Sequence, residues 1–127
     1  MAKILLVEDD AMNRDMMTQR LIWVGYQVIS ANNGAEAVTL ALSEQPDLIL
    51  MDMGLPILNG WQATHRIKCA PETCTIPIIA LTAYALAEDK RKCLAVGCDE
   101  YESKPVDFAR LREKMSALLD NGTPIER

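Results

Sequence analysis

The sequence contains no uninterrupted apolar run approaching the roughly 20 residues that a membrane-spanning helix needs. It also has no excess of basic residues, since 18 acidic side chains outnumber 13 basic ones and give a net charge of −5. This balance argues against direct binding to nucleic acid and against contact with an anionic membrane surface. The amino terminus leads directly into a predicted strand, with no signal peptide, so we expect a cytoplasmic protein.

Residues that often form soft metal sites are few or poorly spaced. The single histidine, His65, lies in a predicted helix and is interpreted as a surface residue. Two Cys-x4-Cys pairs have a longer spacing than a tight zinc knuckle, and a chain of 127 residues can bury a core without staples. We expect four reduced, structural thiols, with a disulfide or a metal site as the alternative. The seven methionines are interpreted as core filler. The cysteines are Cys69, Cys74, Cys93 and Cys98.

Short unbroken apolar segments are the main structural signal. Apolar runs of four or five residues, bounded by turn residues, are typical of strands buried on both faces of a parallel sheet. A fifth segment is more polar and predicts a weaker strand. The predicted strands are Lys3–Val7, Gln27–Ala31, Leu48–Met51, Ile78–Leu81 and Cys98–Ser103.

Helical patterns follow each of these strands. In the second helix, Ala35, Val38 and Leu42 are expected to form the buried face. The predicted helices lie between Asp10 and Gly25, between Ala35 and Pro46, from Trp61 to Cys69, and from Ala85 to Val96. The last begins near Phe108 and is broken by Asn121-Gly122. Strand then helix, five times over, predicts a single α/β domain with a doubly wound parallel sheet, right-handed crossovers and helices on both faces.

Functional side chains stand at the carboxyl ends of four predicted strands. Glu8 and Asp9 follow the first, Asp52 the third, Thr82 the fourth and Lys104 the fifth. Strand ends at one edge of an open α/β sheet converge, and ligands bind there. Two carboxylates about 4 Å apart repel by on the order of 4 kcal/mol at an effective dielectric near 20, so such a cluster binds protons or a cation.

Oxygen ligands without histidine or cysteine favour a hard ion, Mg²⁺ before Ca²⁺. Acids beside a lysine and a threonine suggest phosphoryl chemistry, in which a carboxylate can be the nucleophile. Asp10, next to the acidic pair, fits a helix cap better than a metal ligand, although the second role stays open.

These motifs resemble the receiver domain of two-component response regulators. The resemblance covers residues 3 to 120 and is closest to receivers of hybrid kinases and phosphorelay proteins. It implies a (βα)5 flavodoxin-like fold with strand order 2-1-3-4-5, a receiver domain at 1–121 and a short tail at 122–127. The motifs are Ile4–Asp10, Leu50-Met51-Asp52 with Pro56 and Gly60, Leu81-Thr82-Ala83, and Lys104-Pro105.

The resemblance implies that Asp52 accepts a phosphoryl group from a histidine kinase or a histidine phosphotransfer protein. It implies Mg²⁺ as the cofactor, held by Asp9, Asp52 and the backbone carbonyl of Gly54, with Glu8 acting through water. The chain would then be a phosphorylated regulator and not an enzyme, with self-phosphorylation and slow autodephosphorylation only.

Further roles follow from the same resemblance. Thr82, the backbone amide of Ala83 and Lys104 would contact the phosphoryl oxygens. Tyr101 would change rotamer as Thr82 moves toward the phosphate. The Lys104–Pro105 peptide bond is expected to be cis, a form found in about 5–6% of X–Pro bonds.

Two positions are expected to tune the lifetime of the phosphoryl group. Gly54 has no side chain to guide or block water, whereas Tyr84 is bulky, so the lifetime stays open. Phosphorylation would remodel a partner-binding face made of the fourth helix, the fifth strand and the fifth helix.

Three other functions fit the residues less well. A haloacid dehalogenase-type phosphatase needs a second acid two positions after the nucleophile, where Gly54 stands. A flavodoxin-like module would bind flavin phosphate after the first strand, where three acids, Glu8 to Asp10, would repel it. A receiver used only for docking would not need the full set of site residues. No output domain fits after Leu119, which favours a stand-alone regulator over an excised domain.

Overall fold

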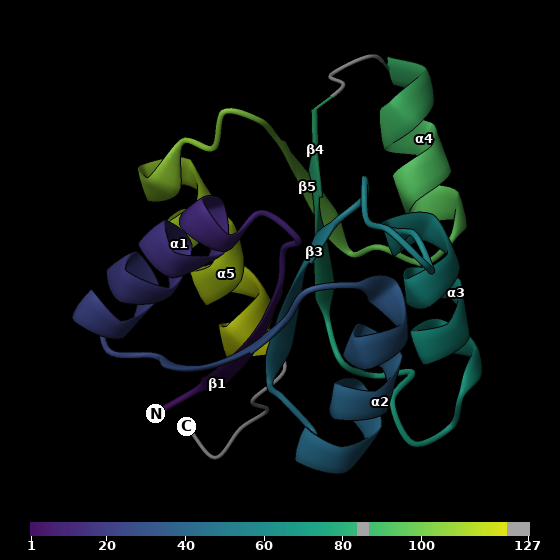
Figure 1. Ribbon diagram of the computed structural model, residues 1–127, viewed down its shortest axis with the longest axis horizontal. Helices are drawn as coiled ribbons and strands as arrows, with labels where there is room; N and C mark the ends of the chain where they lie inside the picture. The colour runs from purple at the N-terminus through teal and green to yellow at the C-terminus, as the bar shows by residue number, and fades with distance from the viewer. Residues whose placement is uncertain (84–86, 122–127) are drawn as a thin grey trace.

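The computed structural model describes residues 1–83 and 87–121, and within them the chain forms one sheet flanked by helices (Figure 1). All strand pairs are parallel and the order is β2-β1-β3-β4-β5, which confirms the predicted fold class and topology. Parallel strands place all their carboxyl ends at one edge of the sheet. The strands are β1 (Lys3–Val7), β2 (Gln27–Ala31), β3 (Leu48–Asp52), β4 (Ile78–Thr82) and β5 (Glu100–Ser103).

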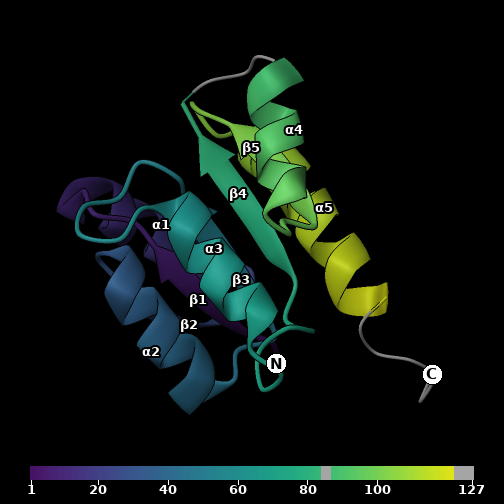
Figure 2. The same ribbon diagram turned by 90° about the vertical axis from the view of Figure 1, so that its right-hand side faces the viewer.

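Helices cover both faces of this sheet. Helices α1 and α5 lie on one face, whereas α2, α3 and α4 lie on the other (Figures 1 and 2). Within the described residues, none of the helices combines the length and the apolar composition that a membrane crossing requires. The helices are α1 (Ala11–Trp23), α2 (Gly34–Glu44), α3 (Gly60–Cys69), α4 (Ala87–Ala95) and α5 (Phe108–Asn121).

The core consists of two apolar layers separated by the sheet. Successive strand residues point to opposite faces, so β3 contributes Leu48 and Leu50 to the layer beneath α1 and α5. Its residues Ile49 and Met51 belong to the opposite layer, beneath α2, α3 and α4. Every residue of β3 is buried, which is why its sequence is an unbroken apolar run that ends at an acid.

The buried face of α2 differs from the prediction. Ala35 and Leu42 are exposed and Val38 is only partly buried, whereas Ala37 and Ala41 are fully buried. Residues with the smallest side chains let this helix approach the sheet closely. Hydrophobicity alone therefore placed the buried face one position away from where it lies.

The strand predicted at Cys98–Ser103 begins two residues later, at Glu100. Gly97 has a φ of 110°, and its N–H donates to Leu94 O while Cys98 N donates to Cys93 O. This hydrogen-bonding pattern is a Schellman motif, which closes a helix with a left-handed glycine. Cys98 therefore belongs to the end of α4 and not to β5.

The methionines are divided between core and surface. Met17, Met51 and others are buried as predicted, but Met12 and Met16 of α1 are exposed, and the core-filler interpretation is wrong for them. The side chain of Trp23, near the end of the same helix, is exposed as well, so α1 has several large apolar side chains on its surface.

The two ends of the described chain lie near each other at the amino edge of the sheet. Ala2 precedes β1, and it lines the same surface pocket as Leu118 and Leu119 near the end of α5. The carboxyl edge, which carries the functional side chains, is at the opposite end of the strands.

Candidate functional site

The backbone brings the functional side chains together through strand register. Asp52 of β3 stands beside Leu81 of β4, so Thr82 lies one residue further along the neighbouring strand. Thr82 pairs with Ser103 of β5, and its carbonyl accepts a hydrogen bond from Lys104 N at 2.7 Å. Asp52, Thr82 and Lys104 therefore meet at the carboxyl edge, as the sequence predicts.

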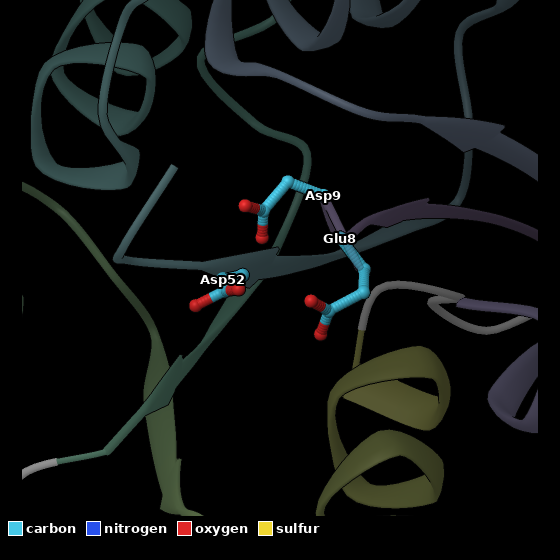
Figure 3. Close-up of side chains that lie close together, drawn as sticks. All are labelled: Glu8, Asp9 and Asp52. Atoms are coloured by element: carbon cyan, nitrogen blue, oxygen red, sulfur yellow. The ribbon is translucent and has the colours of Figure 1, made fainter. Parts of the chain in front are cut away.

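Three carboxylates form a cluster at this edge (Figure 3). Glu8 and Asp9 follow β1, Asp52 ends β3, and one oxygen from each lies within 4.8 Å of the others. Glu8 and Asp52 are buried, whereas Asp9 is exposed to solvent. Within residues 1–83 and 87–121, no other group of three or more histidine, cysteine or acidic side chains is this close. Such a set of hard oxygen atoms fits a cation such as Mg²⁺.

Lys104 bridges two of the acids. Its Nζ lies 3.2 Å from Asp52 Oδ2 and 3.3 Å from Glu8 Oε1. Burial works against the charged form of this amine, but the carboxylates of Asp52 and Glu8 outweigh it and raise the pKa of Lys104. Lys104 is therefore a fixed positive charge at the mouth of the site.

Glu8 is the acid of the cluster whose surroundings disfavour its charged form. Burial and the nearby charge of Asp52 raise the pKa of the Glu8 carboxyl above its ordinary value, against the lowering effects of the Asp10 N–H and Lys104. Its Oε2 accepts a hydrogen bond from Asp10 N at 3.2 Å, and its backbone carbonyl accepts one from Arg14. Two acids and one lysine leave the buried part of the site short of positive charge.

Asp10 has a structural role at the start of α1. It is the N-cap of this helix, and its carboxylate accepts a hydrogen bond from Asn13 N at 3.2 Å. The cap fixes where α1 begins relative to the two acids before it. Asp10 is absent from the carboxylate cluster, in agreement with the preferred sequence interpretation.

A cavity of about 270 Å³ adjoins Asp52. Its lining includes Gly54, Thr82, Ala83 and Lys104, which are the residues expected to hold a phosphoryl group. Gly54 N donates to Asp52 Oδ1 at 3.1 Å, so this turn also orients the carboxylate. Asp52 thus has one oxygen fixed by the backbone and the other paired with Lys104.

Trp61 also lines this cavity, a contact that the sequence analysis did not predict. The signal that could have located it is Asn59-Gly60, which starts α3 directly after the Asp52 loop. Asn59 and Gln62 form a reciprocal capping box there, so Trp61 lies in the first turn of the helix, beside the site.

The remaining predicted residues lie outside the cluster or outside the described chain. Tyr101 is half-buried in β5, with Lys90 of α4 and Lys114 of α5 near its ring at 5.3 and 5.5 Å. The Lys104–Pro105 peptide bond is cis. Tyr84 lies outside the described residues.

The cysteines and the histidine do not contribute to the site. All four cysteines lie within the described residues and none forms a disulfide; Cys69 and Cys74 are exposed, while Cys93 and Cys98 are buried. His65 is exposed, as predicted, on α3 near Cys69.

Residues 4–116 match the response regulator receiver domain family. The chain is 37% identical over 116 residues to the polar-differentiation response regulator DivK of Brucella anthropi, covering 91% of this chain and 94% of DivK. It is 40% identical over 119 residues to the protein PilH of Pseudomonas aeruginosa, covering 94% of this chain and 98% of PilH.

A solved structure with the same fold contains a metal ion. The receiver domain of a sensor histidine kinase from Pseudomonas aeruginosa, with magnesium coordinated in its active-site cleft, matches at a TM-score of 0.87 and 38% identity. The match covers 94% of this chain and 98% of that domain. In this chain, the acidic cluster described above is a group of oxygen atoms that could hold a metal ion.

Proposed function

The chain belongs to the response regulator receiver domain family of two-component signalling systems, and on this premise we propose that Asp52 is its phosphoryl acceptor. One observation carries the assignment. Asp52 is the one buried acid of the described chain that ends a central strand, contacts Lys104 and opens onto a cavity. Its carboxylate can act as a nucleophile toward phosphorus.

In the proposed transfer, an Asp52 oxygen attacks the phosphorus of a phosphohistidine on a histidine kinase or a phosphotransfer protein. The new bond joins phosphorus to Asp52, while the phosphorus–nitrogen bond breaks and its electron pair stays on the imidazole. Lys104, the Thr82 hydroxyl and the Ala83 amide donate to the phosphoryl oxygens as negative charge gathers there.

The same cluster fits Mg²⁺, which we propose as the cofactor. Asp9, Asp52 and the Gly54 carbonyl would hold the ion, with Glu8 acting through water. The fit rests on three clustered carboxylates, of which only Glu8 and Asp52 pair with Lys104, so their negative charge exceeds that of this lysine and suits a divalent cation. Bound Mg²⁺ would neutralise charge on the phosphoryl oxygens during transfer.

Receiver domains interact with histidine kinases and with downstream targets. For this chain we propose that the output face consists of α4, β5 and α5, with Thr82 and Tyr101 as the switch. The ring of Tyr101 in β5 supports this proposal because it contacts Lys90 of α4 and Lys114 of α5, so it connects all three elements of the face. We further propose a cytoplasmic regulator whose receiver domain spans 1–121, with a tail at 122–127 and no turnover beyond self-phosphorylation and slow hydrolysis.

Labelling with acetyl phosphate tests the assignment. Wild-type chain with Mg²⁺ is expected to gain one phosphoryl group by intact mass, and Asp52→Asn is expected to gain none. Asp15→Asn, which neutralises an exposed acid on α1, is the matched control and should be labelled like the wild type. Full labelling of Asp52→Asn would assign the acceptor to another residue.

A further inference from the structure

Trp61 is the only aromatic residue, within the described part of the chain, that lines the cavity beside Asp52. Its side chain is half-buried, so one part of it packs on the apolar layer beneath α2 and α3 while another part meets the cavity. The role inferred below for Trp61 rests on the proposal that Asp52 carries a phosphoryl group.

The position of Trp61 is fixed from the side of Asp52. The preceding residue, Gly60, packs so closely that a Cβ there would overlap the Asp52 carbonyl oxygen and lie 2.6 Å from the Met53 Cα. Gly60 N also donates to Met53 O at 3.1 Å. The first turn of α3 is therefore held against the backbone that carries the acceptor, which fixes the backbone of Trp61 beside the site.

A second contact holds the indole from the side of α4. The ammonium group of Lys92 lies 4.7 Å from the centre of the Trp61 ring. Cations over an indole face are attracted by its negative charge density. Trp61 thus connects the wall of the cavity to the helix that forms part of the proposed output face.

The loop side of Asp52 lacks an equivalent screen. Gly54 has no side chain, although a Cβ at this position would reach 3.9 Å from Asp52 Oδ1. This wall of the cavity therefore places no side chain beside the carboxylate, while a large apolar ring stands on another wall of the same cavity. We propose that Trp61 screens phosphorylated Asp52 from water and sets the lifetime of the phosphoryl group, with Lys92 positioning the ring.

The reaction that Trp61 slows is hydrolysis of the acyl phosphate. A water oxygen bonds to phosphorus, and the bond between phosphorus and the Asp52 oxygen breaks with its electron pair left on Asp52. The carboxylate is restored, and both water protons leave with the product as dihydrogen phosphate. An indole in the path of the water excludes it without taking part in proton transfer.

The lifetime is measured on chain labelled with acetyl phosphate and Mg²⁺ and then freed of the donor by rapid desalting. The remaining acyl phosphate is followed by intact mass. Trp61→Ala is expected to lose it about fivefold faster than wild type, and Lys92→Ala about twofold faster, since an exposed cation–π contact contributes little. Trp61→Phe keeps an aromatic wall and should decay at a rate near that of wild type.

Trp23→Ala, which removes the exposed tryptophan of α1, is the matched control and should not change the rate. If Trp61→Ala fails to fold, Trp61→Leu takes its place, and Lys92→Ala tests the contact from the exposed side. Equal rates in wild type and Trp61→Ala overturn the inference while labelling of Asp52 still stands. No labelling of wild type at all would instead contradict the proposed acceptor.

Discussion

Two glutamates of this chain are buried to nearly the same extent but have opposite charge surroundings. The side chain of Glu102 in β5 is 1% exposed, and each of its oxygens faces a cation, Arg110 Nε at 3.0 Å and Lys114 Nζ at 2.9 Å. Lys114 also lies 3.8 Å from Glu100, but the side chain of Glu100 is 40% exposed. The side chain of Glu8 is 3% exposed, and its one cation, Lys104, is shared with Asp52.

This difference separates a structural acid from an acid of a site. Around Glu102 two cations face one buried carboxylate, and the buried charge is satisfied within the fold. Around Glu8 the carboxylates outnumber the cations, which leaves a charge imbalance that a divalent ion can correct. Burial alone therefore does not identify a functional acid; the ratio of charges around it does.

Removing Glu102, the acid that faces two cations, should change the free energy of unfolding more than neutralising Glu8 does. Glu102→Ala leaves two cations without their buried partner and is expected to lower the free energy of unfolding by about 3 kcal/mol. Urea unfolding monitored by circular dichroism measures this. Glu113→Ala, which removes an exposed acid of α5, should stay within about 0.5 kcal/mol of wild type. A Glu102→Ala chain as stable as the control would mean that its ion pairs contribute nothing.

Adding Mg²⁺ should stabilise the chain through the acidic cluster to which Glu8 belongs. An ion that binds only the folded state at 100 times its dissociation constant adds about 2.7 kcal/mol to the free energy of unfolding. We expect that gain in wild type and equally in Glu102→Ala, whose acidic cluster is intact. Asp9→Asn, which removes an exposed ligand without disturbing the core, should lose most of it. Unfolding curves with Mg²⁺ and with EDTA compare these chains, and an equal gain in Asp9→Asn would place the ion elsewhere.

Neutralising Glu8 should stabilise the metal-free chain, the opposite sign to Glu102→Ala. Because the pKa of Glu8 is raised, the folded chain takes up its proton before the unfolded chain as the pH falls. As the pH is lowered from above the raised pKa of Glu8 to its ordinary value of 4.5, the free energy of unfolding should therefore increase.

Glu8→Gln should lack this rise and should be more stable than wild type at pH 7.5 in EDTA. The difference between the two unfolding curves across the pH range isolates the contribution of this one group. A variant less stable than wild type at neutral pH would show that the Lys104 contact outweighs the repulsion.

The parts of the site that the sequence predicts are those fixed by strand ends. Asp52 and Thr82 follow unbroken apolar runs, and in a parallel sheet the carboxyl ends of such runs must share an edge. Lys104 follows the more polar fifth strand, which the same strand pattern places at this edge. The acidic pair at the end of β1 is predictable for the same reason as Asp52.

The parts that sequence reasoning missed depend on close packing between distant elements. The buried face of α2 uses Ala37 and Ala41, which carry too little hydrophobicity to be recognised from periodicity. Trp61 reaches the cavity because Gly60 lets α3 lie against the Asp52 backbone. The cations of Glu102 come from α5, and nothing in the local sequence of β5 indicates that they would reach it.

The arrangement of the chain ends has a practical consequence for experiments that attach the protein to something else. Ala2 and the end of α5 lie together at the amino edge of the sheet, whereas Asp52 and Lys104 lie at the carboxyl edge. A tag, fluorophore or sensor-surface linker joined beside Ala2 or directly after α5 would start at the edge remote from Asp52. Immobilised chain would therefore present its acidic cluster to the solution in a uniform orientation, which suits direct measurement of partner and ion binding.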